Sequence, residues 1–281
     1  MGQAPVVYGQ SDRPPRGDYT RAHAHYTCTK HYAAYTEAQH DTYHRLYERQ
    51  SALLAGRASQ HFIDALPSLG AKERIPRFEE INDRLFRATG WEIVGVPGLI
   101  PEVPFFSLLA QRQFPVTDWI RKPEEFEYIV EPDIFHDLFG HVPLLFNPVM
   151  ADFIQAYGQG GLKAAELGAC EMLSRLYWYT VEFGLIRENG GVRAYGAGIL
   201  SSVGELEYSV NSPQPHRLPL QLERTMRTLY KIDTYQQTYF VIDDMQQLLS
   251  LANTEFAPLY EQLRQQPTVG AKELLTGEQL L

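Results

Sequence analysis

The chain of 281 residues carries 25 Lys and Arg against 34 Asp and Glu, which gives a formal net charge of −9. Its 44% hydrophobic and 21% charged residues are typical of an ordinary globular protein and exclude disorder of the whole chain. No apolar run is long enough to cross a bilayer, and no cluster of Lys and Arg predicts nucleic-acid binding.

The beginning of the chain shows no hydrophobic periodicity. Residues 1–33 are rich in Pro, Gly and charges, and we expect them to form a flexible N-terminal extension. The first 19 residues lack the apolar region of a secretory signal. The two cysteines, Cys28 and Cys170, form no CxxC pair and suit a reducing compartment. We therefore expect a cytoplasmic protein that binds neither membranes nor nucleic acid.

Helical patterns dominate the first two thirds of the chain and begin near Thr36. One apolar helix face is predicted at Phe78, Ile81, Leu85 and Phe86. Residues 172–186 are apolar nearly all round, which predicts a helix buried at the centre of the fold.

The last third of the chain carries the clearest strand signals. Asn189-Gly190-Gly191 lies between two partly apolar runs and predicts a β-hairpin turn within 186–195. Residues 238–242 predict a strand, and Asp243-Asp244 predicts the cap of a helix that ends near Ala252. A helix face is predicted at Leu218, Leu222, Met226 and Leu229.

These elements predict a mainly α fold with a small amount of short β-sheet. No linker-like break interrupts residues 36–265. We expect one domain at 34–265, followed by a C-terminal tail at 266–281.

The segment EPDIFHDLFGHVP at 131–143 contains two histidines, His136 and His141. Five residues apart in a regular α-helix, they would point about 140° from one another. They can share a ligand only if the helix stops between them. Gly140 favours such a stop, and Pro143 opposes continuation.

Three acidic residues of the same segment, Glu131, Asp133 and Asp137, are candidates to orient the imidazole N–H groups. Spacing alone leaves a second interpretation open, in which the two histidines are partly buried and cap the end of a helix.

A lone carboxylate, Glu182, lies in the apolar run LYWYTVEFGLI. A buried carboxylate is costly unless it is paired, hydrogen-bonded or bound to a metal. An ion pair with Arg175, two helical turns earlier, and a metal ligand both explain it. With His136 and His141, Glu182 would complete a two-histidine, one-carboxylate set, which is typical of non-haem Fe(II) oxygenases.

Several longer stretches resemble one known family. EPDIFHDLFGHVPL, LYWYTVEFGLI, VPGLIP and YGAGILSS are similar to the catalytic domain of the pterin-dependent aromatic amino acid hydroxylases, most of all to its short bacterial members that act on phenylalanine. The resemblance covers about residues 36–263, with the motifs in the family's order. It implies a single catalytic domain, a mostly helical basket around an iron site.

The resemblance also implies roles for individual residues. His136, His141 and Glu182 would bind Fe(II). Catalytic roles would belong to Glu182 and, near the pterin and the iron, to Asp137 and Tyr177. A tetrahydropterin, either tetrahydrobiopterin or a bacterial equivalent, would lie beside the residues Gly98, Leu99 and Ile100 and stack on Phe105.

The resemblance also implies a substrate site. Arg121 would hold the substrate carboxylate, helped by Ser201 and its loop. The slot for the aromatic side chain would be lined by Pro132, Trp178, Phe183 and Gly198.

The activity implied by the resemblance is hydroxylation of L-phenylalanine to L-tyrosine, with O₂ as co-substrate and the tetrahydropterin as two-electron donor. Three alternatives stay open: the same chemistry on tryptophan or tyrosine, a zinc hydrolase with the same ligands, and a non-catalytic binding module. Animal members carry a regulatory domain and a tetramerisation helix. Since neither is seen here, we expect a monomer that is linked to pterin-recycling enzymes through metabolism alone.

Overall fold

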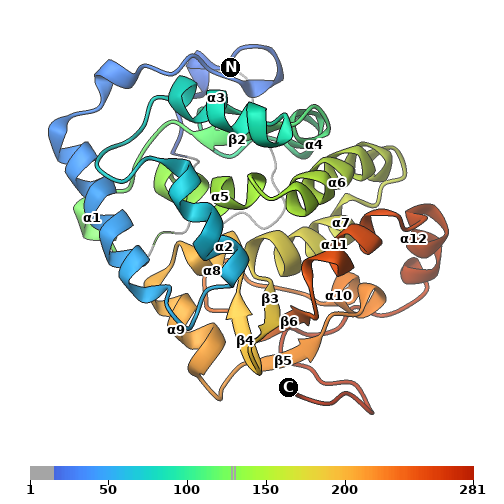
Figure 1. The fold of residues 1–281 in the computed structure, drawn as a ribbon. Coiled ribbons are helices and arrows are strands. Elements are labelled where there is room, and N and C mark those ends of the chain that lie inside the picture. The colour runs from blue at the N-terminus through green and yellow to red at the C-terminus, as the bar shows by residue number, and fades with distance from the viewer. Residues whose placement is uncertain (1–15, 128, 130) are drawn as a thin grey trace.

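Helices form the body of the molecule, and short strands lie at two of its edges (Figure 1). The computed structural model describes residues 16–281 except 128 and 130, so residues 1–15 of the predicted extension lie outside the described part. The predicted mainly α fold with a little sheet is confirmed. No described helix is both long and apolar enough to span a membrane.

Twelve α-helices are described. They are α1 (Glu37–Leu53), α2 (Gln60–Ala65), α3 (Phe78–Thr89), α4 (Glu102–Ala110), α5 (Val142–Leu145), α6 (Pro148–Glu166), α7 (Cys170–Tyr177), α8 (Ala197–Leu200), α9 (Val203–Asn211), α10 (Leu222–Arg227), α11 (Met245–Ala252) and α12 (Phe256–Arg264). Two π-helices, η6 (His136–His141) and η7 (Trp178–Glu182), join this set.

The strands form two small sheets. A parallel pair consists of β1 (Glu92–Val96) and β2 (Gln113–Thr117), with Ile93 opposite Phe114. The second sheet has the order β4-β3-β6-β5 and consists of β3 (Leu185–Glu188), β4 (Gly191–Ala194), β5 (His216–Pro219) and β6 (Thr238–Ile242). In it β3 and β4 are antiparallel, whereas β6 runs parallel to both β3 and β5.

Strands β1 and β2 are joined through α4 and form a β-α-β unit. The loop 97–101 leaves the carboxyl end of β1, and Thr117 ends β2. Ligands bind beside the carboxyl ends of parallel strands in many folds, because loops converge there. The sequence analysis did not predict this unit.

Local sequence signals place several elements as predicted. Thr36 caps α1 through a capping box with Gln39. The hairpin of β3 and β4 turns at Asn189 and Gly190, which both have positive φ, as a two-residue turn requires. Strand β6 covers 238–242, and the Asp244 side chain caps α11, which ends at Ala252.

Three predicted apolar stretches differ from the structure. Phe86 of α3 is 59% exposed, so it does not belong to the buried face of that helix. Leu218 lies in β5 opposite Phe240 instead of on a helix, because pairing with β6 holds that segment extended. The predicted helix at 172–186 ends at Glu182, and Leu185 begins β3.

Both segments that flank the predicted domain contact it. Residues 16–33 hydrogen-bond to the β1–β2 unit, for example from the Cys28 N–H to the Gly95 carbonyl at 2.7 Å. In the segment 266–281, Val269 is buried and pairs with Thr228, and the Leu281 N–H donates to the Arg217 carbonyl. The boundaries at 33 and 266 stay a prediction.

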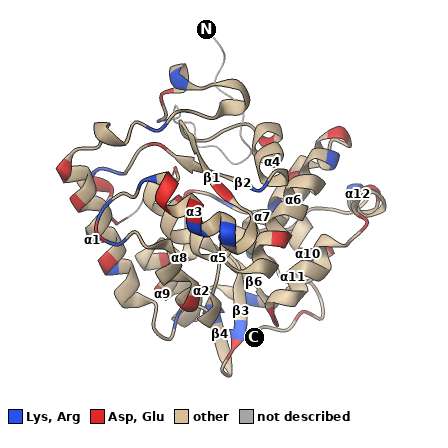
Figure 2. Cartoon of the chain, turned by 45° about the horizontal axis from the view of Figure 1, so that its top comes forward, with Lys and Arg blue, Asp and Glu red and all other residues tan. Residues whose placement is uncertain are grey.

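Charges are spread over the molecule. Lys and Arg alternate with Asp and Glu along the described chain, without a long stripe of one sign (Figure 2). This distribution agrees with the absence of a basic cluster in the sequence.

Candidate active site

One cavity of about 350 Å³ lies between the carboxyl ends of β1 and β2 and the two π-helices. All of the site residues proposed from the sequence line it: Gly98, Leu99, Ile100, Phe105, Arg121, Pro132, His136, Asp137, His141, Tyr177, Trp178, Glu182, Phe183, Gly198 and Ser201. Segments up to about 100 residues apart are thus brought together. The volume of the cavity suits a small organic ligand.

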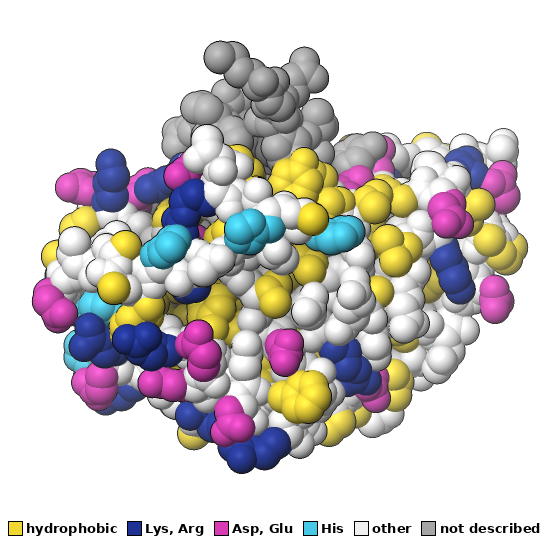
Figure 3. Space-filling model, turned by 90° about the horizontal axis from the view of Figure 1, so that it is seen from above, with side chains coloured by type: hydrophobic (Ala, Val, Ile, Leu, Met, Phe, Trp, Pro, Cys, Tyr) yellow, Lys and Arg dark blue, Asp and Glu magenta, His cyan; other side chains and the backbone are white. Residues whose placement is uncertain are grey.

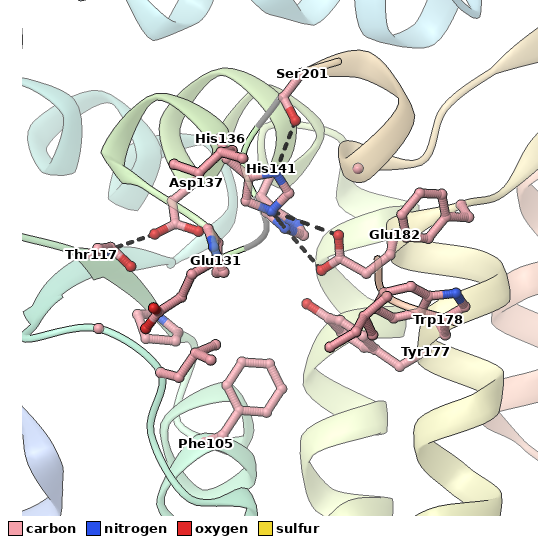
Figure 4. Close-up of a pocket in the computed structure, with 18 of the residues that line it drawn as sticks. Phe105, Thr117, Glu131, His136, Asp137, His141, Tyr177, Trp178, Glu182 and Ser201 are labelled. Atoms are coloured by element: carbon pink, nitrogen blue, oxygen red, sulfur yellow. Dashed lines mark hydrogen bonds and ion pairs between the residues drawn. The ribbon is translucent and has the colours of Figure 1, made fainter. Parts of the chain in front are cut away.

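Three side chains converge at one side of this cavity (Figure 4). The Nε2 atoms of His136 and His141 are 3.2 Å apart. The carboxylate of Glu182 lies 3.1 Å from the His141 Nε2 and 3.6 Å from the His136 Nε2. Among the described residues this is the one group of three His, Cys, Asp or Glu side chains placed to hold a metal ion.

The two histidines converge because their helix widens, and the predicted stop between them is wrong. Residues 136–141 form a π-helix, which continues directly into α5. Its i→i+5 hydrogen bonds place residues five apart one turn above one another. Gly140 acts through packing, since a Cβ there would lie 2.8 Å from the Ala197 carbonyl oxygen of α8.

Glu182 is presented by the second π-helix. The Phe183 N–H donates to the Trp178 carbonyl at 2.8 Å, an i→i+5 bond at the end of η7. Arg175 is engaged elsewhere: it pairs with Glu171 and donates to the Met226 carbonyl. The alternative of a Glu182–Arg175 ion pair is therefore excluded.

Ser201 fixes the tautomer of His136. The Ser201 hydroxyl donates to the Ala197 carbonyl at 2.8 Å, because that oxygen can only accept. Ser201 Oγ therefore accepts the Nδ1–H of His136, also at 2.8 Å. The Nε2 lone pair of His136 is left to face Glu182 and His141, as a metal ligand requires.

The three acidic residues of the motif do not orient the imidazoles as predicted. Asp133 accepts the backbone N–H of His136 at 3.0 Å, Asp137 accepts that of Thr117 at 2.7 Å, and Glu131 accepts that of Arg16. Among the described residues, none of the three bonds to an imidazole nitrogen. Their carboxylates are used to satisfy backbone donors of neighbouring segments.

Burial and charge set the protonation of the converging groups. Burial lowers the pKa of His136 to about 4, so this imidazole is neutral near pH 7. Burial would also lower the pKa of His141, but the adjacent Glu182 carboxylate outweighs it and raises that pKa. Burial likewise opposes ionisation of Glu182, yet His141 holds its pKa below the usual value. A carboxylate and a neutral imidazole are the forms that bind metals.

Asp137 has a strongly altered acidity. Burial raises the pKa of its carboxyl to about 7, against the opposing effects of His141 and the Thr117 amide. Near neutral pH this group can therefore either donate or accept a proton inside the cavity.

Arg121 and Asp133 form a buried ion pair beside the histidines. Asp133 Oδ2 lies 2.8 Å from the Arg121 Nε, and Oδ1 lies 3.0 Å from Nη2. Both side chains are at most 3% exposed. Arg121 lines the cavity, and its Nη1 group forms no hydrogen bond with a described residue.

Aromatic side chains form the walls. Phe105 meets Tyr177 edge to face at 5.6 Å between ring centres. Trp178 lies between Phe183 at 4.6 Å and Tyr230, on which it stacks at 4.2 Å. These rings make part of the cavity wall apolar.

Sequence reasoning missed several polar lining residues. Glu102, Thr117, Glu205 and Gln236 line the cavity, and Gln236 accepts the indole N–H of Trp178 at 2.9 Å. Thr117 could have been found at the carboxyl end of the short, partly apolar run QFPVT. No local signal marks Gln236 as a lining residue, because its partners in the cavity wall, Trp178 and Glu205, lie in distant segments of the sequence.

The donor set fits a divalent metal ion. Two donor atoms that each lie about 2.1 Å from the same ion are about 3.0 Å apart when they are at right angles about it. They are about 3.4 Å apart at the tetrahedral angle. Two of the observed separations, 3.1 and 3.2 Å, lie in that range, and the third, 3.6 Å between Glu182 and His136, is slightly longer. Three protein ligands on one side leave other coordination positions open, as in facial-triad oxygenases.

Comparison with known proteins gives a consistent result. The family model described as "Biopterin-dependent aromatic amino acid hydroxylase" matches residues 10–264. A phenylalanine-4-hydroxylase of Ralstonia nicotianae is 55% identical over 248 residues, 88% of this chain and 79% of that protein. A phenylalanine-4-hydroxylase of Caulobacter vibrioides is 48% identical over 97% of this chain and 92% of that one.

Solved structures agree with this relationship. The cobalt-bound phenylalanine hydroxylase of Chromobacterium violaceum superposes with a TM-score of 0.91 at 50% identity, covering 92% of this chain and 95% of that one. The family resemblance of the motifs and the single catalytic domain are thereby confirmed. By sequence and by fold, the chain belongs to the biopterin-dependent aromatic amino acid hydroxylase family.

Proposed function

We propose that this protein is a monooxygenase that converts L-phenylalanine to L-tyrosine, with Fe(II), a tetrahydropterin and O₂. The observation that carries the proposal is the open two-histidine, one-carboxylate set at the wall of an aromatic cavity. Relatives about 50% identical over most of the chain are phenylalanine-4-hydroxylases.

Fe(II) would be held by His136, His141 and Glu182. Bound together, iron and the reduced pterin supply the activation of O₂ that protein side chains cannot perform. The contribution of the chain is the open coordination side of this ligand set and the aromatic walls, which keep water from the reacting centre.

The tetrahydropterin would lie against Gly98, Leu99 and Ile100, with its ring on Phe105. Asp137 lies on the same side of the cavity as the Thr117 amide that binds its Oδ2. This contact leaves Oδ1 of Asp137 to accept a pterin N–H or, when protonated, to donate to a ring atom. Tyr177 packs on Phe105 and limits the tilt of that ring.

The amino acid substrate would be held by its carboxylate on the outer edge of Arg121. Asp133 fixes the guanidinium by its other edge, so the open edge is oriented before the substrate binds. The Ser201 hydroxyl has no proton left to give to that carboxylate, since it donates to Ala197. The phenyl ring would enter the slot of Pro132, Trp178, Phe183 and Gly198 and point its para carbon at the metal.

Turnover with omission of single components tests this function. Purified protein loaded with Fe(II) should form tyrosine only when L-phenylalanine, tetrahydropterin and O₂ are all present. Parallel reactions with L-tryptophan and L-tyrosine rank the substrates. If either is turned over faster than L-phenylalanine, that amino acid is the substrate instead. Tyrosine formed without pterin, or no product from any of the three amino acids with iron bound, contradicts it.

A further inference from the structure

The N-terminal strap, which we define as residues 16–30, crosses the outside of the loop 97–101. Its backbone touches that loop directly: a Cβ on Gly17 would lie 2.1 Å from the Pro97 carbonyl oxygen. The loop forms the wall of the cavity at Gly98, Leu99 and Ile100. The strap therefore lies behind the wall against which the pterin is proposed to bind.

Two hydrogen bonds join the strap to residues that line the cavity. The Tyr19 hydroxyl donates to the Leu99 carbonyl at 2.7 Å. The Arg16 N–H donates to both carboxylate oxygens of Glu131, at 3.3 and 3.2 Å. Burial, with Glu131 nearby, raises the pKa of Tyr19 to about 12, so its hydroxyl keeps the proton that it donates.

The side chain of Arg16 anchors this end of the strap. Its guanidinium binds Glu125 through two nitrogens, at 2.6 and 3.0 Å. It also lies over the Trp119 ring, 4.3 Å from the ring centre. Charge pairing and the cation–π contact both restrain the strap at this point.

The other end of the strap is fastened to β1 and to the residues at the end of β2. The Cys28 N–H donates to the Gly95 carbonyl of β1. Lys30 Nζ lies 3.2 Å from Asp118 and donates to the Thr117 carbonyl, while Arg21 binds Asp118 at 2.7 Å. The loop 97–101 is thus spanned by a segment that is fixed on both sides of it.

The Tyr19 contact controls the direction of one peptide unit. In a trans peptide the carbonyl and the N–H of the next residue point in opposite directions. A Leu99 carbonyl held toward Tyr19 therefore turns the Ile100 N–H away from the strap, toward the side of the cavity. Within the described part of the chain, this N–H has no hydrogen-bond acceptor, so it remains free for a ligand.

We propose that the strap supports the loop 97–101 from outside and that Tyr19 is a positioning residue for the pterin, acting through the Leu99–Ile100 peptide. The ligand is a flat heteroaromatic ring whose acceptor atoms meet the backbone of this loop. This inference rests on the proposed pterin site. It adds a role for a segment that the sequence predicts to be a tail.

Figure 3 views the molecule from above, the side on which the strap lies, and shows Lys, Arg, Asp and Glu side chains scattered over that face. The contacts that matter point inward from the strap to Leu99 and Glu131.

Tyr19→Phe removes one hydroxyl and leaves the ring in place. Tyr26→Phe is the matched control, because Tyr26 lies on the same strap and its hydroxyl bonds to no described residue. Arg16→Pro is a second, broader variant, since proline lacks both the N–H that binds Glu131 and the guanidinium that binds Glu125.

The first measurement is hydrogen–deuterium exchange of the amides at 96–101 in metal-loaded protein without pterin. A lost neutral hydrogen bond changes an equilibrium about 3- to 10-fold. We expect exchange of this peptide to rise by that factor in Tyr19→Phe, by at least that factor in Arg16→Pro, which loses several contacts, and to stay unchanged in Tyr26→Phe. Unchanged exchange in both strap variants overturns the support role, whether or not a pterin binds.

The second measurement is anaerobic calorimetric titration of tetrahydrobiopterin, together with steady-state kinetics. For Tyr19→Phe we expect the Kd and the KM of the pterin to rise about 3- to 10-fold. The KM of L-phenylalanine, kcat and the bound iron should stay within twofold of the unaltered protein. Faster exchange without weaker pterin binding overturns the positioning role. If the unaltered protein does not bind the pterin, the proposed cofactor is wrong. The exchange experiment is carried out without pterin, so its result does not depend on that cofactor.

Discussion

His136 and His141 lie with their Nε2 atoms 3.2 Å apart although five residues separate them in one continuous helix. The π-helical turn makes this possible, and close packing on α8 holds that turn in place. The geometry of the proposed ligand set therefore depends on a backbone distortion as much as on the identity of the side chains.

Gly140→Ala tests this dependence while keeping all three ligands. The added Cβ would lie 2.8 Å from the Ala197 carbonyl oxygen, so η6 must shift away from α8. We expect iron affinity to fall at least tenfold, measured by competition with a chelator. Gly160→Ala in α6 is the control, since nothing lies within 4 Å of its Cβ, and it should bind iron normally. Normal iron affinity in Gly140→Ala would show that the turn tolerates the shift.

Ser201→Ala tests the orientation of the His136 ring. Without the hydroxyl, the Nδ1–H of this buried imidazole loses its acceptor and the required tautomer is no longer favoured. Loss of such outer partners weakens metal binding by about 10- to 100-fold. Iron titration in the variant measures the effect, and an unchanged dissociation constant would contradict the tautomer argument.

Asp133→Asn tests the buried ion pair that orients Arg121. Removing one charge leaves the guanidinium buried without compensation, which costs about 3–5 kcal/mol of unfolding free energy. We also expect a higher KM for L-phenylalanine, because the open edge of Arg121 is no longer held. Asp152→Asn, which removes the partly exposed partner of Arg112, should cost less than about 1 kcal/mol. Equal losses in the two variants, measured by urea unfolding, would contradict the prediction.

Glu205→Gln should make the protein more stable at neutral pH. Burial raises the pKa of Glu205 from 4.5 to about 7, so ionisation is easier in the unfolded chain than in the folded one. Stability is therefore lost as the pH rises from about 4.5 to 7 and stays lower above that range. Glutamine can accept the same bonds from the Gln236 N–H and the Tyr239 hydroxyl without a charge.

The expected gain for Glu205→Gln is roughly 1–3 kcal/mol at pH 8 and close to zero at pH 4.5. Thermal unfolding across this range measures it. Glu207→Gln on the same helix is the control, because the pKa of Glu207 is lowered by Asn211 and Arg57 and no gain is expected. A gain that does not depend on pH would require another explanation.

Glu278→Gln tests the attachment of the C-terminal segment. Glu278 Oε1 lies 2.5 Å from the Nε of Arg224, which is 5% exposed and also donates to the Glu273 carbonyl. We expect a loss of roughly 1–3 kcal/mol in urea unfolding, since a buried guanidinium loses its counter-charge. Glu273→Gln should have little effect because Arg224 contacts only its backbone. Stability equal to that of the unaltered protein would show that the segment contributes little.

Elements whose signals are local could be predicted from the amino-acid sequence. Thr36 and Asp244 cap their helices, and Asn189-Gly190 forms its hairpin turn, because each interaction spans only a few residues. The three converging side chains were also identified from the sequence, although a regular helix could not bring the two histidines of the motif together.

The way in which the three side chains meet, and the residues around them, depend on the packing of distant segments. The widening of η6, the ion pair of Arg121 with Asp133 and the contacts of Tyr19 and Gln236 all depend on partners brought from distant segments. Strands β1, β2 and β5 also depend on distant segments, because a strand of four or five residues is stable only when it is paired with a neighbouring strand. Hydrophobic periodicity reports which face of an element is buried, but it does not report which partner lies on that face.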